Sequence, residues 1–340
     1  MRGMSTPHHP TGSAGAISVP EAAAELARGN LVALPTETVY GLGADATNPR
    51  AVAGIFAAKG RPADHPLIVH LAPEASLDEW AIDIPEAARA LAKAFWPGPL
   101  TMILKKSPRV PAIVTGGQDS VGLRCPSHPV AQALLREFAM IGSGAVAAPS
   151  ANKFGHVSPT TAQHVRDEFG PDLPVLDGGA CEVGLESTIV DLTRGVPVLL
   201  RPGRISREDI AAVLGVAPHD RDVQAPRASG TLAAHYAPRT PLVLVEPDQL
   251  ETRVRAAAAE GKRVAVLSLG RAPTPLAAFG RSAPADARGY GHDLYANLRA
   301  LDANHADLIV VESPPADAAW EAVRDRLARA AAGTDEDDET

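Results

Sequence analysis

Cysteine and aromatic residues are scarce in this 340-residue chain, which has two Cys and only 4% Phe, Trp and Tyr. Cys125 and Cys181 form no C-x-x-C pair, so nothing indicates a zinc site or a disulfide framework, and we expect two buried, reduced thiols. No run of about 18 apolar residues predicts a membrane helix, and residues 1–16 lack the apolar core of a secretory signal. These absences favour a cytoplasmic protein.

A basic surface is also missing, because acidic residues outnumber basic ones and the formal net charge is −8. This balance argues against broad electrostatic attraction, so we expect no stable nucleic-acid complex and no membrane association. Any phosphate site must then be a local cluster of cations. With 45% hydrophobic residues the chain is globular, and its length favours two domains over one core.

Two common phosphate-binding motifs are absent or incomplete. No segment has the G-x-x-x-x-G-K-[ST] pattern of a P-loop. The run Gly41–Ala46 fits G-x-G-x-x-A, but residues 47–49 delay the helix that a dinucleotide-binding fingerprint opens directly. This run therefore argues against a Rossmann nucleotide site.

The stretch from Leu31 to Leu71 is the most informative part of the sequence. Its first four residues, 31–34, form a short apolar run that is typical of a buried strand. Thr36 follows where this strand ends. Gly41 and Gly43 come next, and they are expected to let the backbone bend sharply and lie close to a ligand.

A helix is predicted next, because Asn48 is suited to cap its start and Gly60 to end it. Lys59 and Arg61 then lie at the end of this helix, just before a second buried strand at residues 66–71. Guanidinium and ammonium groups at such a position suit an anionic ligand. The stretch therefore predicts a pocket for an anion.

Polar side chains also follow two later strands. Arg124 ends an apolar strand, and a buried guanidinium needs either an ion pair or an anionic ligand. Ser150 and Asn152 follow the buried strand at residues 145–148, in a turn whose small side chains let a ligand come close. These residues extend the predicted pocket.

Two further features leave alternatives open. Ser158 either caps the helix at residues 162–169 or contacts the ligand. Glu186 and Asp191 are a candidate carboxylate pair for acid/base work. Their spacing puts them on opposite faces of a strand, which argues against that role.

The second half of the chain changes character. Residues 205–239 contain proline, glycine and charge without a long apolar period, apart from a short helix near residues 207–214, and loops of this length are often functional lids. Strands then alternate with helices, which predicts a small parallel α/β domain at residues 240–333 without a catalytic set of its own. Residues 1–16 and the acidic run 334–340 are expected to be disordered.

The order of these motifs resembles the L-threonylcarbamoyladenylate synthase family of YrdC-like proteins. The resemblance rests on PTETVYGLG, KGRP before PLIVH, WPGPLT, the R-x-P at Arg124, PSAN, SPT, ESTIVD and LLRPG. A later HYAP at residues 235–238, followed by more α/β sequence, is similar to the family's long, two-domain form. Lys153 and Phe154 depart from the family pattern after PSAN.

The resemblance implies an α/β fold in which residues 17–204 form a YrdC-like twisted mixed sheet around a concave basic site. A linker or lid at 205–239 and a small parallel, Rossmann-like domain at 240–333 would follow. The implied ATP contacts are Lys59, Arg61, Thr115, Ser150, Asn152, Ser158, Arg201, His235 and Tyr236. The implied L-threonine contacts are Thr36, His70, Arg124 and Ser187. From the residues alone, His70 is equally a satisfied core histidine, and Tyr236 equally an anchor for the linker.

The implied reaction converts L-threonine, bicarbonate and ATP, with Mg²⁺, into L-threonylcarbamoyl-AMP and pyrophosphate. This product would supply downstream machinery that makes threonylcarbamoyladenosine in tRNA. The carbamate of threonine attacks the α-phosphorus itself, so no side-chain nucleophile is needed and the protein mainly positions reactants.

Two other interpretations stay open. One is a YrdC-like module that binds RNA or a nucleotide through phosphate contacts without synthesis. The other is a carbamoyl-adenylating unit like that of hydrogenase maturation proteins. The acylphosphatase and zinc-finger segments that accompany that unit are not visible in this sequence.

Overall fold

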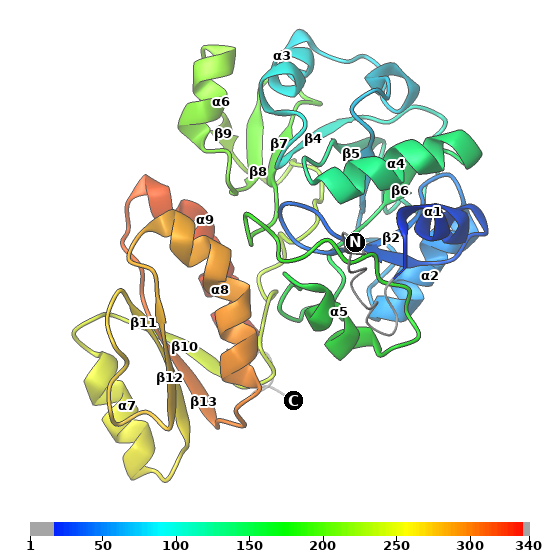
Figure 1. Cartoon of the computed structure of the whole chain (residues 1–340). Coiled ribbons are helices and arrows are strands. Elements are labelled where there is room, and N and C mark those ends of the chain that lie inside the picture. The colour runs from blue at the N-terminus through cyan, green and yellow to red at the C-terminus, as the bar shows by residue number, and fades with distance from the viewer. Residues whose placement is uncertain (1–16, 336–340) are drawn as a thin grey trace, which may run out of the picture.

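The computed structural model describes residues 17–335, so the predicted disordered lead at 1–16 and most of the acidic run at 334–340 lie outside the described residues. Two α/β domains lie side by side (Figure 1). The larger domain contains α1 (Val19–Ala27), β1 (Val32–Leu34), β2 (Gly41–Asp45), α2 (Pro49–Lys59), β3 (Ile68–Leu71), η1 (Leu77–Glu79), α3 (Glu86–Phe95), β4 (Leu100–Lys105), β5 (Ser120–Arg124), α4 (Pro129–Ile141), β6 (Ala145–Ala147), α5 (Ala162–Phe169), β7 (Thr188–Asp191), β8 (Val198–Arg201), α6 (Arg207–Leu214) and β9 (His219–Asp220). The smaller domain contains β10 (Leu242–Val245), α7 (Leu250–Ala259), β11 (Val264–Leu269), β12 (Phe279–Ala283), α8 (Ala287–Asp302), β13 (Leu308–Glu312), η2 (Ala318–Trp320) and α9 (Glu321–Asp335).

The larger domain is built on one mixed sheet with the order β1-β2-β6-β3-β5-β4-β7-β8-β9. Strand β3 pairs parallel with β5 and antiparallel with β6, while β4 pairs antiparallel with β5 and parallel with β7. The predicted mixed sheet is confirmed. The ends of β3, β5, β6 and β8 carry the polar motifs that the sequence singled out.

The smaller domain has a parallel sheet with the order β10-β13-β11-β12, as the alternation of strands and helices predicted. Helices α8 and α9 lie between this sheet and the larger domain, and α7 lies on the far side (Figure 1). Leu185 and Val157 of the larger domain join one hydrophobic cluster with Leu294 and Tyr295 of α8. The interface therefore contains continuous core and not only surface contacts.

The predicted boundaries of α2 are confirmed. The side chain of Asn48 accepts hydrogen bonds from the backbone N–H groups of Arg50 and Ala51, and Gly60 adopts the left-handed conformation that ends the helix. Lys59 is consequently the last helical residue, and it is buried. The helix end thus delivers a cation into the protein.

The bend expected at Gly41 and Gly43 is wrong, because both lie within β2. The structure gives Gly43 a packing role. A Cβ atom there would lie 2.7 Å from the side chains of both Leu34 and Val146. Because glycine has no side chain, Leu34 of β1 and Val146 of β6 can pack directly against the backbone of Gly43.

Two other local expectations need correction. Thr161, and not Ser158, caps α5, since its side chain accepts from the backbone N–H of His164. Strand β12 was not predicted, because its sequence, FGRSA, lacks the apolar run of a buried strand and lies at the edge of the sheet.

Candidate active site

A small chamber of about 40 Å³ lies where the polar strand ends meet the linker. Its walls include four residues predicted to bind threonine, namely Thr36, His70, Arg124 and Ser187. They also include four residues predicted to bind ATP, namely Ser150, Arg201, His235 and Tyr236. The structure therefore brings together side chains from positions 36 to 236 of the chain.

Two arginines on one side of the chamber contact the linker. Arg201 donates from Nε and Nη2 to the backbone oxygen of Ser187, at 3.1 and 2.9 Å, and from Nη1 to the backbone oxygen of Ser229 at 2.9 Å. Arg61 lies just behind the wall and donates to Pro66 O at 3.0 Å and to Ser229 Oγ at 3.3 Å. Both guanidinium groups are buried.

Lys59 and Asn152 support the turn at Ser150 from behind. The Nζ of Lys59 donates to the backbone oxygens of Ser150, at 2.6 Å, and of Asn152. The amide of Asn152 donates to the backbone oxygens of Lys153 and His156, at 2.7 and 2.9 Å. The ammonium group and the turn therefore form one unit.

Lys59, Arg61 and Arg201 contact only neutral oxygens. Within residues 17–335, none of the three has a carboxylate within ion-pair distance, although all are buried. Burial lowers the pKa of Lys59 well below 10.5, lowers that of Arg61 to about 10, and lowers that of Arg201. Buried charge is unfavourable unless it is paired, so this side of the chamber is prepared for an anion.

Arg124, which also lines the chamber, is paired. Its Nη2 lies 2.7 Å from Oε1 of Glu37, and its Nη1 donates to Thr38 Oγ1 at 2.9 Å. The predicted alternatives of ion pair and ligand contact are therefore compatible, because Arg124 forms the ion pair and also lines the chamber. Thr36 is fixed nearby, its hydroxyl donating to Val39 O at 2.6 Å.

His70 lies beside Arg124 in the sheet, whereas Ser187 also contacts Arg201, whose Nη2 donates to its Oγ at 3.2 Å. Burial and the neighbouring charge of Arg124 lower the pKa of His70 to about 3, so its ring is neutral near pH 7. Its Nδ1 has no hydrogen-bond partner within the described part of the chain. The Oγ of Ser187 lies 2.7 Å from Thr101 Oγ1, so the WPGPLT motif holds this hydroxyl.

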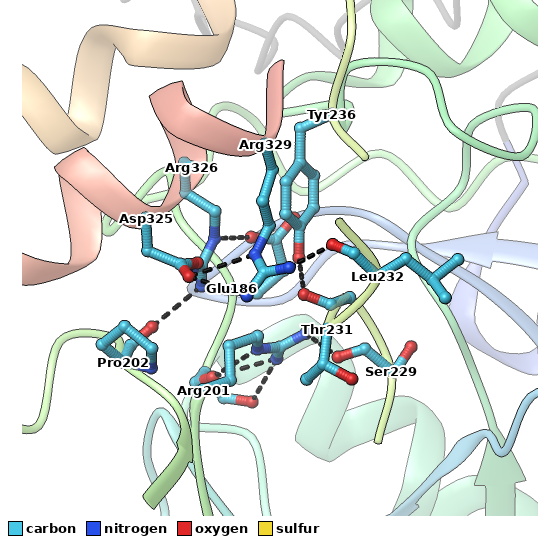
Figure 2. A network of polar contacts seen from close by, with 12 residues as sticks. Glu186, Arg201, Pro202, Ser229, Thr231, Leu232, Tyr236, Asp325, Arg326 and Arg329 are labelled. Atoms are coloured by element: carbon cyan, nitrogen blue, oxygen red, sulfur yellow. Dashed lines mark hydrogen bonds and ion pairs between the residues drawn. The ribbon is translucent and has the colours of Figure 1, made fainter. Parts of the chain in front are cut away.

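Glu186 connects the chamber to the smaller domain. It accepts from Ser158 Oγ at 2.6 Å, from Tyr295 Oη at 2.8 Å and from Arg326 Nε at 2.9 Å. Burial alone would raise the pKa of Glu186, but the charges of Arg326 and Arg201 and its hydrogen bonds lower it to about 2. Figure 2 shows Arg326 of α9 reaching Glu186 and the backbone oxygen of Pro202.

The linker closes the remaining wall. Tyr236 is buried and packs against Tyr295, with 5.7 Å between ring centroids, and against the guanidinium of Arg326. His235 packs edge-on against Tyr236 at 4.4 Å. Tyr236 therefore anchors the linker and lines the chamber at the same time.

Five predicted ATP residues do not line the chamber, although three of them, Lys59, Arg61 and Ser158, contact residues that do. Lys59, Arg61, Asn152 and Ser158 form the layer behind the wall. Thr115 is buried in a separate turn, where its hydroxyl donates to Ala112 O at 3.2 Å and to Gln118 O at 2.8 Å.

Sequence reasoning missed three groups near the chamber: Ser229 of the linker, and Tyr295 and Arg326 of the smaller domain. Glu186 was considered only as half of a carboxylate pair. Asp191 instead pairs with Arg194 at 3.1 Å, so the structure supports the doubt about that pair. Only the SGT residues close to HYAP offered a local signal for Ser229.

Both cysteines are buried, as predicted, and burial raises the pKa of each thiol to about 12. Among residues 17–335, no three His, Cys, Asp or Glu side chains are grouped to hold a metal ion. In the same range, no helix combines the length and apolarity needed to cross a membrane.

Comparison with known proteins agrees with this architecture. The family model described as Telomere recombination matches residues 24–203, and that of the threonylcarbamoyl-AMP synthase C-terminal domain matches residues 205–332. Threonylcarbamoyl-AMP synthase of Pyrococcus abyssi is 41% identical over 322 residues, 91% of this chain and 92% of that protein. The Bacillus subtilis protein of the same name is 40% identical over 328 residues, 93% of each chain.

The solved structure of P. abyssi Sua5 complexed with L-threonine superposes with a TM-score of 0.86 at 39% identity, covering 93% of this chain and 94% of that one. The fold and chamber thus define a two-domain α/β protein of the YrdC-like class. Within that class, the chain belongs to the threonylcarbamoyl-AMP synthase family.

Proposed function

We propose that the chain is a nucleotidyltransferase that makes L-threonylcarbamoyl-AMP and pyrophosphate from L-threonine, bicarbonate and ATP. The observation that carries the proposal is the set of three buried cations, Lys59, Arg61 and Arg201, that contact only neutral oxygens. A triphosphate would supply the missing negative charge. Relatives with this domain arrangement carry the name of this activity, which supports the same conclusion.

The nucleotide side is proposed to work by positioning and charge. Arg201 and Arg61 would give up their contacts with Ser229 and bind phosphate oxygens, as forked guanidinium groups do well. Lys59 would act through the Ser150–Asn152 turn. This turn would lie against the nucleotide, while the charges stabilise the pyrophosphate as it leaves.

The threonine side is proposed to hold the amino acid by Thr36, His70, Arg124 and Ser187. Arg124 would bind the carboxylate of threonine. The neutral ring of His70 offers its unpartnered Nδ1 to a polar group of the ligand. Support comes from the similar P. abyssi Sua5, whose solved structure is a complex with L-threonine.

The chemistry needs no protein nucleophile. The amine of threonine attacks CO₂ formed from bicarbonate, which releases water, and the resulting carbamate oxygen attacks the α-phosphorus as pyrophosphate leaves. The carbamate is labile in water, so the linker is proposed to close over the chamber and exclude solvent. The product would then pass to a separate transferase that modifies tRNA.

Magnesium does not fit as a resident ion. Glu186, the carboxylate that lines the chamber in the described structure, is already satisfied by Ser158, Tyr295 and Arg326. Glu37 is paired with Arg124. We therefore treat Mg²⁺ as part of the ATP substrate and assign it no protein ligand.

The decisive experiment measures pyrophosphate release from ATP and Mg²⁺, with and without L-threonine and with and without bicarbonate. Release that requires both co-substrates is the expected result. ATP binding without release would contradict the synthase and favour a nucleotide-binding module. Valine in place of threonine is expected to be rejected strongly, because a site that hydrogen-bonds a hydroxyl is left unsatisfied by a methyl group.

A further inference from the structure

The linker is held at two places that differ in their relation to the chamber. The first is Ser229, whose backbone oxygen accepts from Arg201 at 2.9 Å and whose Oγ accepts from Arg61 at 3.3 Å. Both guanidinium groups are proposed phosphate ligands. These contacts must therefore break or rearrange when ATP binds.

The second place lies outside the chamber, at Arg227. Gln118 pairs with the backbone of Arg227, accepting from its N–H at 2.8 Å and donating to its oxygen at 3.1 Å. The guanidinium of Arg227 donates to Gly116 O at 2.8 Å and lies 3.4 Å from Asp64 Oδ2. None of these groups lines the chamber or is proposed to bind substrate.

The turn that presents Gln118 is fixed by its own hydrogen bonds. Thr115 Oγ1 donates to Gln118 O at 2.8 Å, and the Nε2 of Gln118 donates to Thr115 O at 3.3 Å. The backbone N–H of Gly117 donates to Ala112 O at 2.9 Å. The side chain of Gln118 is thus held ready for the linker.

Apolar contacts extend this attachment. Ala225 and Ala228, on either side of Arg227, pack against the cluster that contains Ile68, Ile103 and Ile189. Only a small hollow of about 10 Å³ remains under the linker, and Gln118 and Arg227 are among the residues that line it. The attachment therefore combines the hydrogen bonds of Gln118 with apolar packing of Ala225 and Ala228.

We infer that Gln118 and Arg227 form the pivot of the linker. Gln118 is a positioning residue that keeps the Arg227 backbone in place while Ser229 moves off Arg201 and Arg61 to admit the triphosphate. The movement over the chamber rests on the proposed function, whereas the clamp itself does not.

The test is hydrogen exchange of the Arg227 amide in the full chain, with and without ATP and Mg²⁺. In wild type this amide should stay protected in both conditions. Gln118→Ala should speed its exchange by roughly tenfold, the effect of losing two neutral hydrogen bonds. Gln249→Ala is the matched control, since Gln249 is exposed and makes no capping bond, and it should change nothing.

Unchanged exchange in Gln118→Ala, or loss of Arg227 protection when ATP binds to wild type, would overturn the pivot. If Gln118→Ala does not fold, Arg227→Ala replaces it, because this variant removes the contacts to Gly116 and Asp64 from the exposed linker side. Its expected change is smaller, about threefold, and no change would count against the pivot.

Kinetics separate this inference from the proposed function. Gln118→Ala should raise KM for ATP by roughly fivefold and leave KM for threonine unchanged, because only the nucleotide side is covered by this part of the linker. Equal changes in both values would contradict a positioning role. A wild-type chain that never releases pyrophosphate would defeat the synthase proposal, while the exchange test would still decide the pivot.

Discussion

The two sides of the chamber carry positive charge in different ways. Arg124 is neutralised by Glu37 at 2.7 Å, so its side has no net charge before a ligand arrives. Lys59, Arg61 and Arg201 have no carboxylate partner in the described structure, so their side is cationic. A neutral side suits a zwitterionic amino acid, and a cationic side suits a polyanion. This difference is the basis for the places that we propose for the two substrates.

The largest loss of activity is expected when a cation without a carboxylate partner is removed. Arg201→Ala would lose the two or more charge-assisted hydrogen bonds to phosphate that we propose, each worth about 1.5 to 3 kcal/mol, so kcat/KM for ATP should fall by at least about 100-fold. Pyrophosphate release at varied ATP measures it. Arg136→Ala, which removes an exposed ion pair with Glu74, should leave the rate unchanged. A normal rate in Arg201→Ala would refute the assignment of the cationic side.

The paired side should respond to the other substrate. Arg124→Ala would remove the proposed charge-assisted contact with the threonine carboxylate and leave Glu37 buried without its partner, so KM for threonine should rise by roughly 10- to 100-fold. KM for ATP should stay within about threefold, since Arg124 is not a proposed phosphate ligand. Parallel titrations of both substrates give the answer. Comparable increases for both would erase the distinction between the sides.

A loss of activity of intermediate size is expected from a substitution at Gly230 of the linker. A Cβ on Gly230 would lie 2.0 Å from Tyr236 Oη and 2.9 Å from Arg201 Nη1. Gly230→Ala should therefore displace the linker from the cationic side and lower kcat/KM for ATP by about tenfold, measured by pyrophosphate release. Gly215 also has a positive φ, of 74° against 71°, but nothing lies within 4 Å of its Cβ position. Gly215→Ala therefore controls for backbone strain, and equal activity of the two variants would contradict the steric argument.

The smallest expected effect is on the pH dependence of the free energy of unfolding, because His70 and His235 are both buried and neutral. Burial, with Arg124 near His70 and Arg61 near His235, lowers both pKa values from 6.5 to about 3. The unfolded chain binds these protons near pH 6.5 and the folded chain does not, so the free energy of unfolding should fall as pH decreases below 6.5. Each histidine should contribute about 1 kcal/mol by pH 5.5. Urea unfolding of His70→Gln and His235→Gln should show a shallower decrease, and an unaltered slope would disprove buried neutral rings.

Local signals predicted the fold well where they acted within a few residues. Asn48 and Gly60 bound the helix that places Lys59, and apolar runs located most of the strands of both sheets. Gly43 misled because a glycine that admits Leu34 and Val146 looks, in sequence, like a glycine that bends. Packing between residues on different strands leaves no signal in the nearby sequence, so it could not be predicted.

The site was predicted only in part, because some of its residues have a local sequence signal and others are brought there by long-range contacts. Arg124 was found because a cation after an apolar run is unusual, and Arg201 was named through the family resemblance. Arg326 was not found, since it lies in the middle of an ordinary amphipathic helix and meets Glu186 from 140 positions away. Ser229 was missed because the shorter of its two arginine contacts, with Arg201 at 2.9 Å, uses a backbone oxygen, which every residue has.

The ion pair of Glu186 and Arg326 also has a consequence for how the protein unfolds. Both side chains are buried, with 8% and 0% of their surface exposed, and they belong to different domains. Pulling the domains apart would leave an unpaired carboxylate in one and an unpaired guanidinium in the other, at a cost of several kcal/mol. Partial opening is therefore disfavoured relative to complete melting. The two domains should behave as a single cooperative unit in calorimetry, although each has a sheet of its own.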